Sequence, residues 1–344
     1  MYLLFFLLFS FILPLQAEKI IQCIVDFPVD PHFYTQVLQE KGYEGKVVIT
    51  PINDYKESLL KRKGLLHGWL RKVHLDYPWK ATVSEEVDKI VFFNIPPSVC
   101  RKYDLSRLPK EKMVLFMWEP KTVLKKMYRP EIQACFSKVY TWDDSLVDGI
   151  KYFKFNYPVL VPMIADRVAF EEKKLCTLVS SNLKGSGRNE LYSKRKEAIA
   201  YFEQVKEEGF EFYGRRWDSA LHSSYRGEIA DKLQVMKNYR FCICYENTQG
   251  VDGYITEKIF DCFAAGVVPV YWGASNIETY IPKGCFIDRR DFNSLEELHA
   301  FMKKMTRETY DDYLAQIQLF LQSKEAQAFT FGQLAQHFYE AVAL

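Results

Sequence analysis

The stretch "CYENTQGVDGYITEKIFDCFAAGVVPVYWG", residues 244–273, decides the fold of this chain. The apolar run that leads into it, 241–245, and the later run 267–272 both predict buried strands. Between the two runs, apolar residues repeat at helical spacing, namely Ile255, Ile259, Cys262 and Phe263. Gly266 follows as a residue type that commonly ends a helix. Continuously apolar strands joined by a helix predict a parallel sheet that is covered on both faces.

The helix in this stretch starts with charged residues. Thr256 is a favourable N-cap residue, which places Glu257 and Lys258 in the first turn. A helix N-terminus carries unpaired N–H groups and about half a positive charge, so a lysine there opposes the helix dipole. A bound anion would remove this conflict, and the carboxylate of Glu257 suits the hydroxyls of a sugar or ribose. A solvated helix start, with Lys258 pointing outward, is the alternative interpretation.

Three more polar residues lie close to this helix start in the sequence. Glu246 and Asn247 directly follow the first strand, and Tyr254 lies in the loop before the helix. Their side chains should converge on the carboxyl end of one strand, which is where open α/β sheets bind ligands. We therefore predict a charged ligand held by Glu246, Asn247, Tyr254, Glu257 and Lys258.

Strand-like and helix-like runs alternate along the whole chain after residue 18. Further strands are expected at 19–25, 46–50, 89–94, 113–119, 138–142, 174–180, 211–214 and 285–288. Further helices are expected at 190–209, 228–238, 294–304, 307–322 and 325–342. Because 156–165 contains two prolines and no clear period, it is interpreted as a linker. The pattern predicts an α/β fold with two Rossmann-like domains facing a cleft, 18–160 on the acceptor side and 161–344, which includes the terminal helices.

Composition narrows the class of protein. The chain has 344 residues, of which 48% are apolar, so a large core is expected and general disorder is not. The formal net charge is only +2. A nucleic-acid partner is therefore not expected, because it would require a clustered basic surface, although a local basic pocket is compatible with this charge.

The eight cysteines show no zinc-binding or redox spacing, because no CxxC pair occurs. Buried apolar thiols are the simplest interpretation. Cys242 and Cys244 should point to the same face of one strand, which is a poor geometry for a mutual disulfide. One or two disulfides elsewhere stay open if the chain is exported.

Residues 1–17 predict a signal peptide or a short membrane anchor. The run "MYLLFFLLFSFILPL" is apolar but shorter than the ~20 residues that span a bilayer, and Ala17 is a candidate cleavage residue. A buried N-terminal strand or helix is the alternative. The expected location is the secretory pathway or a membrane: Golgi-type in a eukaryote, exported or envelope-associated in a bacterium.

Two charged residues outside the opening stretch are candidates for the site. Glu119 follows the strand-like run "MVLFMW" and precedes Pro120, which should place its carboxylate at the cleft, where desolvation would raise its pKa toward that of a general base. Arg195 lies in the helix after the loop "SSNLKGSG", whose glycines would let backbone amides approach a phosphate. A strand-end charge and a surface arginine are the respective alternatives.

The adjacent carboxylates of Asp143 and Asp144 raise the question of a metal site. Neighbours on an extended segment point apart, so a helix-start role fits these residues better. The histidines also lack ligand spacing. We therefore predict no metal ligands and no required cofactor.

The segment "FCICYENTQGVDGYITEKIFDCFAAGVVPVYWGASNIETYIP" (241–282) resembles the donor-binding signature of the α-1,3/1,4-fucosyltransferases, glycosyltransferase family ten. Weaker similarity covers "MWEP", "YTWDDSLVDGIKYFKFNYP", the region around Arg195 and "FIDRRDF". The resemblance implies a GT-B fold, GDP-fucose as donor, a glycan acceptor and an inverting mechanism. It also implies Glu119 as the general base, Arg195 and Lys258 on the diphosphate, and Glu257, Asn247 and Tyr254 on the nucleotide sugar. Family members are often stimulated by manganese, so Mn²⁺ is an optional activator.

Other functions stay open at this point. A GT-B transferase with another sugar nucleotide would share most of these features, and a sugar-nucleotide or glycan-binding protein without turnover would share the site. A secreted structural domain explains the polar loop 246–258 less well. The acceptor is equally open between an N-glycan core, a lactosamine-type chain and a bacterial surface polysaccharide.

Overall fold

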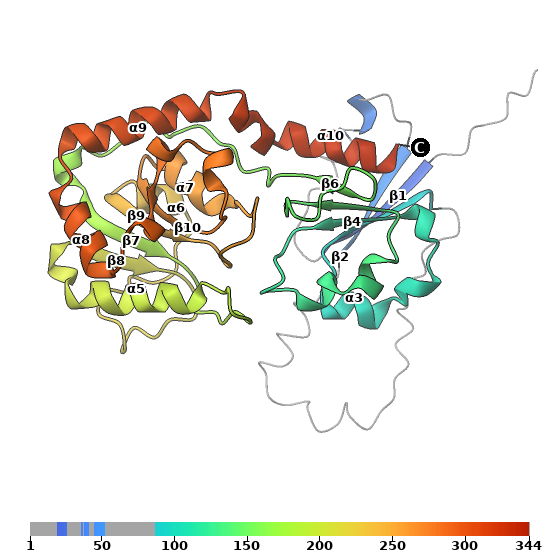
Figure 1. Ribbon diagram of the computed structural model, residues 1–344, viewed down its shortest axis with the longest axis horizontal. Helices are drawn as coiled ribbons and strands as arrows, with labels where there is room; N and C mark the ends of the chain where they lie inside the picture. Colours follow the sequence, from blue (N-terminus) through green and yellow to red (C-terminus); the bar gives the residue numbers. More distant parts are fainter. Residues whose placement is uncertain (1–18, 26–35, 37, 41–44, 52–86, 344) are drawn as a thin grey trace, which may run out of the picture.

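The computed structural model describes residues 19–25, 36, 38–40, 45–51 and 87–343, and it contains two parallel β-sheets side by side (Figure 1). The first sheet has the strand order β2-β1-β3-β4-β5-β6. Its strands are β1 (Lys19–Val25), β2 (Gly45–Pro51), β3 (Lys89–Phe93), β4 (Met113–Met117), β5 (Lys138–Thr141) and β6 (Tyr152–Lys154). All of these strands pair in parallel, as their apolar character predicted.

The second sheet has the order β11-β10-β9-β7-β8, again with parallel pairing throughout. Its strands are β7 (Lys174–Val179), β8 (Phe210–Tyr213), β9 (Tyr239–Tyr245), β10 (Val268–Trp272) and β11 (Ile287–Asp288). The helices described in the two domains are α3 (Pro97–Lys102), α4 (Pro130–Gln133), α5 (Tyr192–Gln204), α6 (Lys232–Met236), α7 (Glu257–Ala264), α8 (Leu295–Lys304), α9 (Arg307–Leu321) and α10 (Phe331–Val342).

Both faces of each sheet are buried. In β4, Val114 and Phe116 belong to one apolar cluster, and Met113, Leu115 and Met117 belong to another. The strands of the second sheet divide in the same way between two clusters. This double burial explains why the strands read as continuous apolar runs. The predicted two-domain α/β fold is confirmed.

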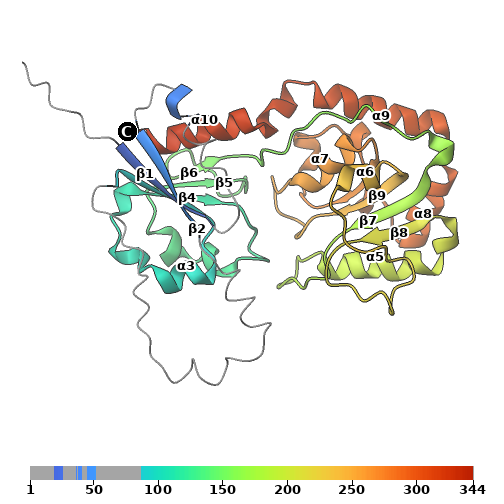
Figure 2. The ribbon, with the colours of Figure 1, turned by 180° about the vertical axis from the view of Figure 1, so that it is seen from behind.

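The last helix differs from the domain division expected from the sequence. α9 packs on the C-terminal sheet, but α10 crosses to the N-terminal sheet, so the two helices run along the same side of both domains (Figures 1 and 2). The apolar stripe of α10 is buried there at helical spacing, with Leu334, Phe338, Ala341 and Val342 against the sheet. The expected single helix 325–342 is interrupted at Thr330, which caps α10 by accepting a hydrogen bond from the N–H of Gln333.

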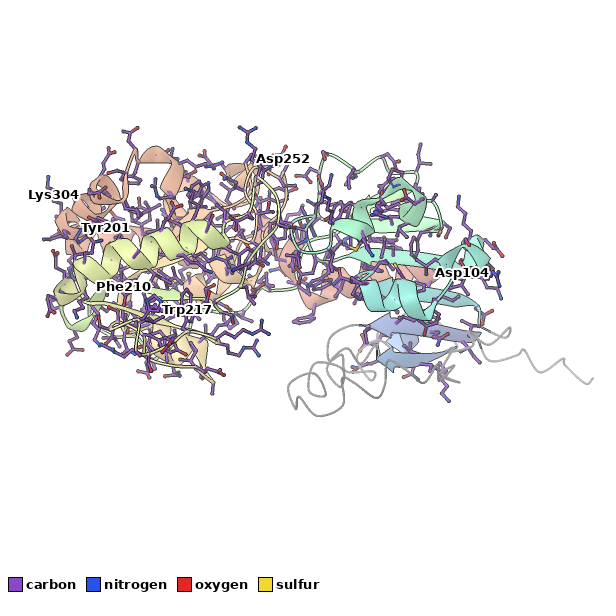
Figure 3. All side chains as sticks on the ribbon, turned by 90° about the horizontal axis from the view of Figure 1, so that it is seen from below. Asp104, Tyr201, Phe210, Trp217, Asp252 and Lys304 are labelled. Atoms are coloured by element: carbon purple, nitrogen blue, oxygen red, sulfur yellow. The ribbon has the colours of Figure 1, made fainter. Side chains whose placement is uncertain are left out.

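Asp144 makes several of the direct contacts between the domains. Its carboxylate accepts hydrogen bonds from Lys154 Nζ at 2.6 Å, from Asn276 Nδ2 at 2.8 Å and from the Tyr280 hydroxyl at 2.7 Å. The Asp144 N–H donates to the carbonyl of Asp252 at 3.3 Å. Figure 3 shows Asp252 at the edge of the C-terminal domain that faces the other domain. The loop after β9 is therefore joined to the N-terminal domain.

The structure tests the predictions for the cysteines. All eight cysteines lie in the described part of the chain and are free thiols, six of them buried. Cys242 and Cys244 face the same apolar cluster, as predicted. The predicted segment 1–17 lies outside the described residues. Within the described ranges, no helix has both the length and the apolar character needed to cross a membrane.

Candidate active site

A cavity of about 590 Å³ lies between the two domains, at the carboxyl ends of β4, β7 and β9. Five of the seven predicted site residues line it, namely Glu119, Arg195, Asn247, Glu257 and Lys258. Glu119 comes from the N-terminal domain and the other four come from the C-terminal domain. The position agrees with the rule that open α/β sheets bind ligands outside the carboxyl ends of their strands.

Glu246 does not line this cavity, unlike its neighbour Asn247. Its side chain is fully buried, and its Oε1 accepts a hydrogen bond from the Thr256 N–H at 2.9 Å. The Thr256 hydroxyl also donates to Glu246, and Lys258 Nζ donates to Oε2 at 3.0 Å. Glu246 therefore stabilises the start of α7. It was predicted to contact the ligand, but in the structure its side chain lies away from the cavity.

Thr256 is the N-cap residue of α7, as predicted, but its side chain does not cap the helix. It bonds to Glu246 instead, because the buried carboxylate takes the role of acceptor for the Thr256 N–H and hydroxyl. The expected C′ position is confirmed, since Gly266 has φ +64° directly after the helix end.

Lys258 is positioned by this buried network. Its Nζ also donates to Thr256 Oγ1 at 2.8 Å and lies 3.4 Å from Glu257 Oε1. Burial alone would lower the pKa of Lys258, but the carboxylates of Glu246 and Glu257 outweigh it and raise the pKa above its usual value. The ammonium is thus held charged at the cavity wall.

Glu257 is more exposed than Lys258, and about half of its side-chain surface is open at the cavity. Burial of its carboxyl would raise the pKa, but the nearby Lys258 and Lys232 lower the pKa of Glu257 to about 2. It is therefore an ionised hydrogen-bond acceptor at neutral pH. A carboxylate of this kind suits the paired hydroxyls of a sugar or ribose.

Arg195 is fixed to the end of β9 by hydrogen bonds. Its Nη2 donates to the carbonyl of Tyr245 at 2.7 Å and to Asn247 Oδ1 at 3.0 Å, and its Nη1 donates to Ser180 Oγ at 3.3 Å. The guanidinium also lies 4.8 Å from the centre of the Tyr192 ring. A second cation, held rigidly, thus lines the same cavity as Lys258.

Glu119 is positioned by the end of the neighbouring strand. Asn94, directly after β3, has a left-handed φ of 65°, and its Oδ1 accepts hydrogen bonds from the N–H groups of Trp118 and Glu119 at 2.9 and 2.8 Å. The hydroxyl of Tyr128 donates to the carbonyl of Glu119 at 3.0 Å. The backbone of the candidate base is therefore held on both sides. No signal in the sequence pointed to Asn94.

Tyr254 also differs from its predicted role. It is 1% exposed and does not line the cavity. Its ring packs 4.4 Å from that of Trp142 and 6.2 Å from that of Tyr157, centre to centre, so it fills the contact between the domains.

Sequence reasoning missed several residues that line the cavity. The wall also includes Ser180, Tyr192, Arg215, Glu228 and Lys232. Lys232 lies in α6 and is separated from Lys258 in the sequence by β9 and the loop that follows it. Its Nζ lies 2.9 Å from the carboxylate of Asp261 in α7. Such residues enter the site through the packing of α6 on α7, which a local pattern does not report.

The aspartates considered for a metal are engaged by protein donors. The carboxylate of Asp144 is occupied by the three donors already described, and Asp143 Oδ1 accepts from the N–H and hydroxyl of Ser145 at 3.0 and 2.6 Å. Across the described ranges, no group of three or more His, Cys, Asp or Glu side chains is arranged to hold a metal ion.

Most of the C-terminal domain, which supplies the greater part of this cavity wall, matches a known protein family. Residues 169–333 match the family described as glycosyltransferase family 10 (fucosyltransferase), C-terminal part. An α-(1,4)-fucosyltransferase of Arabidopsis thaliana is 32% identical over 152 residues, which cover 44% of this chain and 33% of the plant protein. The α-(1,3)-fucosyltransferase FucT of Helicobacter pylori is 26% identical over 151 residues, or 44% and 28% of the two chains. These matches thus span about a third of the length of each relative.

Solved structures extend the similarity to both domains. A crystal structure of an α1,3-fucosyltransferase has a TM-score of 0.54 at 13% identity, with 95% of this chain and 90% of that chain covered. Structures of an α1,3-fucosyltransferase with GDP and with GDP-fucose each have a TM-score of 0.52. At this identity the likeness concerns the fold. The chain has the GT-B fold, and its residues 169–333 match the model of glycosyltransferase family 10, the fucosyltransferases.

Proposed function

We propose that this protein is an inverting fucosyltransferase that moves L-fucose from GDP-fucose to O3 or O4 of a GlcNAc residue in a glycan acceptor, with formation of an α-linkage. The observation that carries the proposal is the single cavity in which Glu119 of one domain faces Arg195, Glu257 and Lys258 of the other. The donor is the one that the family implies.

In this proposal the C-terminal domain holds the donor. Arg195 and Lys258 neutralise the diphosphate, and Glu257 and Asn247 accept or donate hydrogen bonds to the nucleotide sugar. The start of α7 adds its N-terminal N–H groups. Each preorganised contact of this kind contributes roughly 3 kcal/mol when charge develops in the transition state.

The reaction itself requires one proton transfer. Glu119 accepts the proton of the attacking acceptor hydroxyl while the bond between the fucose anomeric carbon and the β-phosphate oxygen breaks, and that bond's electron pair leaves with GDP. The acceptor oxygen forms the new bond on the opposite face, through an oxocarbenium-like state. GDP needs charge neutralisation rather than a proton, which the two cations supply. A positioned base contributes roughly 10²–10⁴-fold.

The first experiment is a measurement of nucleoside diphosphate release by purified residues 18–344, with a mixed acceptor panel: GDP from GDP-fucose and from the control donor GDP-mannose, and UDP from the control donor UDP-galactose. We expect acceptor-dependent release from GDP-fucose alone. Release from another donor would contradict GDP-fucose as the donor but would still agree with a GT-B glycosyltransferase. GDP binding without release from any donor across the panel would favour a binding protein without turnover.

We also propose that residues 1–17 direct the chain to the secretory pathway or a membrane, Golgi-type in a eukaryote and exported or envelope-associated in a bacterium. The support is the apolar sequence of this segment. Fractionation of cells that express the chain with and without residues 2–17 tests it: an unchanged distribution would contradict the proposal.

A further inference from the structure

All strands of the first sheet start beside a lysine. In neighbouring strands Ile90 pairs with Met113 and Val139 pairs with Tyr152, which aligns the lysines that precede them. Since strands lie about 4.8 Å apart, the strand starts form a row roughly 24 Å long. β1 itself begins at Lys19. We call the other lysines of this row the lysine edge, namely Lys46, Lys89, Lys110, Lys112, Lys138 and Lys151.

The lysine edge lies opposite the candidate active site. The cavity is at the carboxyl end of β4, and the sheet is parallel, so the strand starts lie at its other edge. Figure 1 shows the end of the chain on this outer side of the N-terminal domain, and Lys138 Nζ donates to the carbonyl of Glu340 in α10 at 2.8 Å. β1 begins here at Lys19, two residues after the apolar segment 1–17. The segment proposed to reach a membrane is therefore joined to the lysine edge.

Several ammonium groups of the lysine edge bond to backbone oxygens. Lys89 and Lys151 donate to the carbonyls of Glu111 and Gln133 at 3.1 and 2.8 Å, and Lys138 does the same at Glu340. Within the described ranges, none of these three lysines has a carboxylate at ion-pair distance. In the second sheet, by contrast, Lys174 at the start of β7 pairs with Glu211 at 2.7 Å. The cations of the first sheet are thus available to an external anion.

Neighbouring cations of the lysine edge repel one another. Burial lowers the pKa of Lys89, and the nearby ammonium of Lys138 lowers it further. Burial and the ammonium of Lys110 act in the same way on the pKa of Lys151. A negatively charged surface beside the row would therefore stabilise the charged form of these side chains.

Two carboxylates at this edge are engaged by the backbone. Asp88 Oδ2 accepts a hydrogen bond from the Ile20 N–H at 2.7 Å. Asp148 Oδ1 accepts hydrogen bonds from the N–H groups of residues 150–152, each at 2.8 Å. Glu111 is exposed and contributes one negative charge to the row. The described lysines of the edge outnumber these three carboxylates, so the edge is basic.

An exposed apolar residue lies at one end of the row. Ile150 directly precedes Lys151 and is 84% exposed, more than any other large apolar side chain in the described ranges. Basic side chains beside an exposed apolar residue are the combination by which proteins bind the interface of an anionic membrane. A nucleic acid would match the cations but would leave Ile150 without an apolar partner.

We infer that the lysine edge docks on a membrane that carries anionic phospholipids, with its ammonium groups among the lipid phosphates and Ile150 at the boundary of the acyl chains. The inference takes its partner from the proposed membrane role of residues 1–17 and does not depend on the fucosyltransferase assignment. It also fixes an orientation. β4 has five residues, which at about 3.3 Å each place Glu119 roughly 20 Å from the lysine edge, so the cavity opens on the side away from the lipid.

The test is a labelling experiment on the full chain. The chain is reconstituted into neutral phosphatidylcholine vesicles and into vesicles that contain phosphatidylglycerol, and its lysines are acetylated with acetic anhydride and read by mass spectrometry. We expect Lys89, Lys138 and Lys151 to react roughly fivefold more slowly on the anionic vesicles, which is the factor that one lysine contributes near such a surface. Lys304, at the far end of the C-terminal domain (Figure 3), should react equally on both. The difference should disappear in about 1 M salt, where the Debye length is about 3 Å.

A charge variant sharpens the test. The triple variant Lys46→Gln, Lys110→Gln, Lys151→Gln removes three cations and leaves Lys89 and Lys138 as reporters, whose slower acetylation on anionic vesicles should be lost. The matched control replaces three exposed lysines of the C-terminal domain and should retain it: Lys206→Gln, Lys304→Gln, Lys324→Gln. Circular dichroism should be unchanged in both variants.

The outcomes separate this inference from the other proposals. Equal acetylation of the lysine edge on neutral and anionic vesicles overturns it, and so does protection that the charge variant retains. Protection by added single-stranded RNA, with none from anionic vesicles, would assign the row to a nucleic acid and also overturn it. Anionic-specific protection in a chain that does not bind neutral vesicles supports the lysine edge and contradicts the membrane role of residues 1–17 alone. Fucose transfer enters none of these measurements.

Discussion

Two glutamates of this chain follow buried parallel strands, Glu119 after β4 and Glu246 after β9, yet they have opposite surroundings. Glu119 lines the cavity between the domains. Glu246 is fully buried and bonded to Thr256 and Lys258. The segments that contact the two residues differ. A turn at Pro120 follows Glu119, and the Thr122 carbonyl in this turn accepts a hydrogen bond from Ser186 of the other domain. At Glu246, the start of α7 bonds directly to the carboxylate through Thr256 and Lys258. A carboxylate at a strand end is therefore a ligand group or a support according to whether a helix start covers it.

The largest expected effect is on Glu119. Because it is the proposed base, Glu119→Gln should lower kcat by roughly 10²–10⁴-fold and leave the GDP dissociation constant unchanged. Steady-state kinetics and calorimetry check the two parts. Lost GDP affinity would instead show that Glu119 is a donor ligand or a structural residue.

Glu246 should respond in stability. Glu246→Gln breaks a buried pair with Lys258, which typically costs about 3–5 kcal/mol of unfolding free energy, measured by urea denaturation. The double variant Glu246→Gln, Lys258→Met should lose less than the sum of the single variants, since both members of the pair are then neutral. An unchanged denaturation midpoint for Glu246→Gln would break the contrast with Glu119.

Lys258 has both a structural and a ligand-binding position, because it pairs with the buried Glu246 and also lines the cavity. Lys258→Ala should weaken the use of GDP-fucose by roughly 10²–10³-fold in kcat/KM, and Arg195→Ala should do the same, while circular dichroism reports a folded protein in both cases. Because Lys258→Ala leaves the buried carboxylate of Glu246 unpaired, this variant should also have a lower urea midpoint. Normal donor kinetics in a folded Lys258→Ala protein would end the assignment of this lysine to the diphosphate.

The smallest effect is expected at Asn94, which positions the backbone of Glu119. Asn94→Gly keeps the left-handed φ accessible but removes two hydrogen bonds. We expect roughly tenfold lower kcat through misplacement of the base, with unchanged GDP affinity. Asn94→Ala adds backbone strain and should also lower stability. If Asn94→Gly lowers stability but not kcat, Asn94 supports the strand and not the base.

Much of the fold follows from short-range patterns in the sequence. The parallel strands were predictable because burial on both faces leaves few polar positions, and α7 was predictable from its apolar face and Gly266. β6 was missed because it is short and only partly buried. The expected helix at 228–238 is reduced to α6, Lys232–Met236, because a local pattern does not show which turns gain tertiary packing.

The sequence correctly predicted that the candidate site lies at the carboxyl ends of the strands. Arg195, Asn247, Glu257 and Lys258 each follow a strand or start a helix, and they meet at one cavity for that reason. Glu246 and Tyr254 lie next to the cavity in the sequence, but their side chains are buried away from it. The sequence did not show this, because the burial of a side chain depends on the element that packs against it. Asn94 acts across two strands and leaves no local signal.

The crossing of α10 has a consequence for biosynthesis. The face of the N-terminal sheet that Phe338 covers stays open to water until the entire C-terminal sheet has emerged from the ribosome. The first domain therefore cannot be completed by vectorial folding, and its apolar face must avoid aggregation during translation of the second domain. Chaperone occupancy of nascent chains should accordingly persist until residues 331–342 are released.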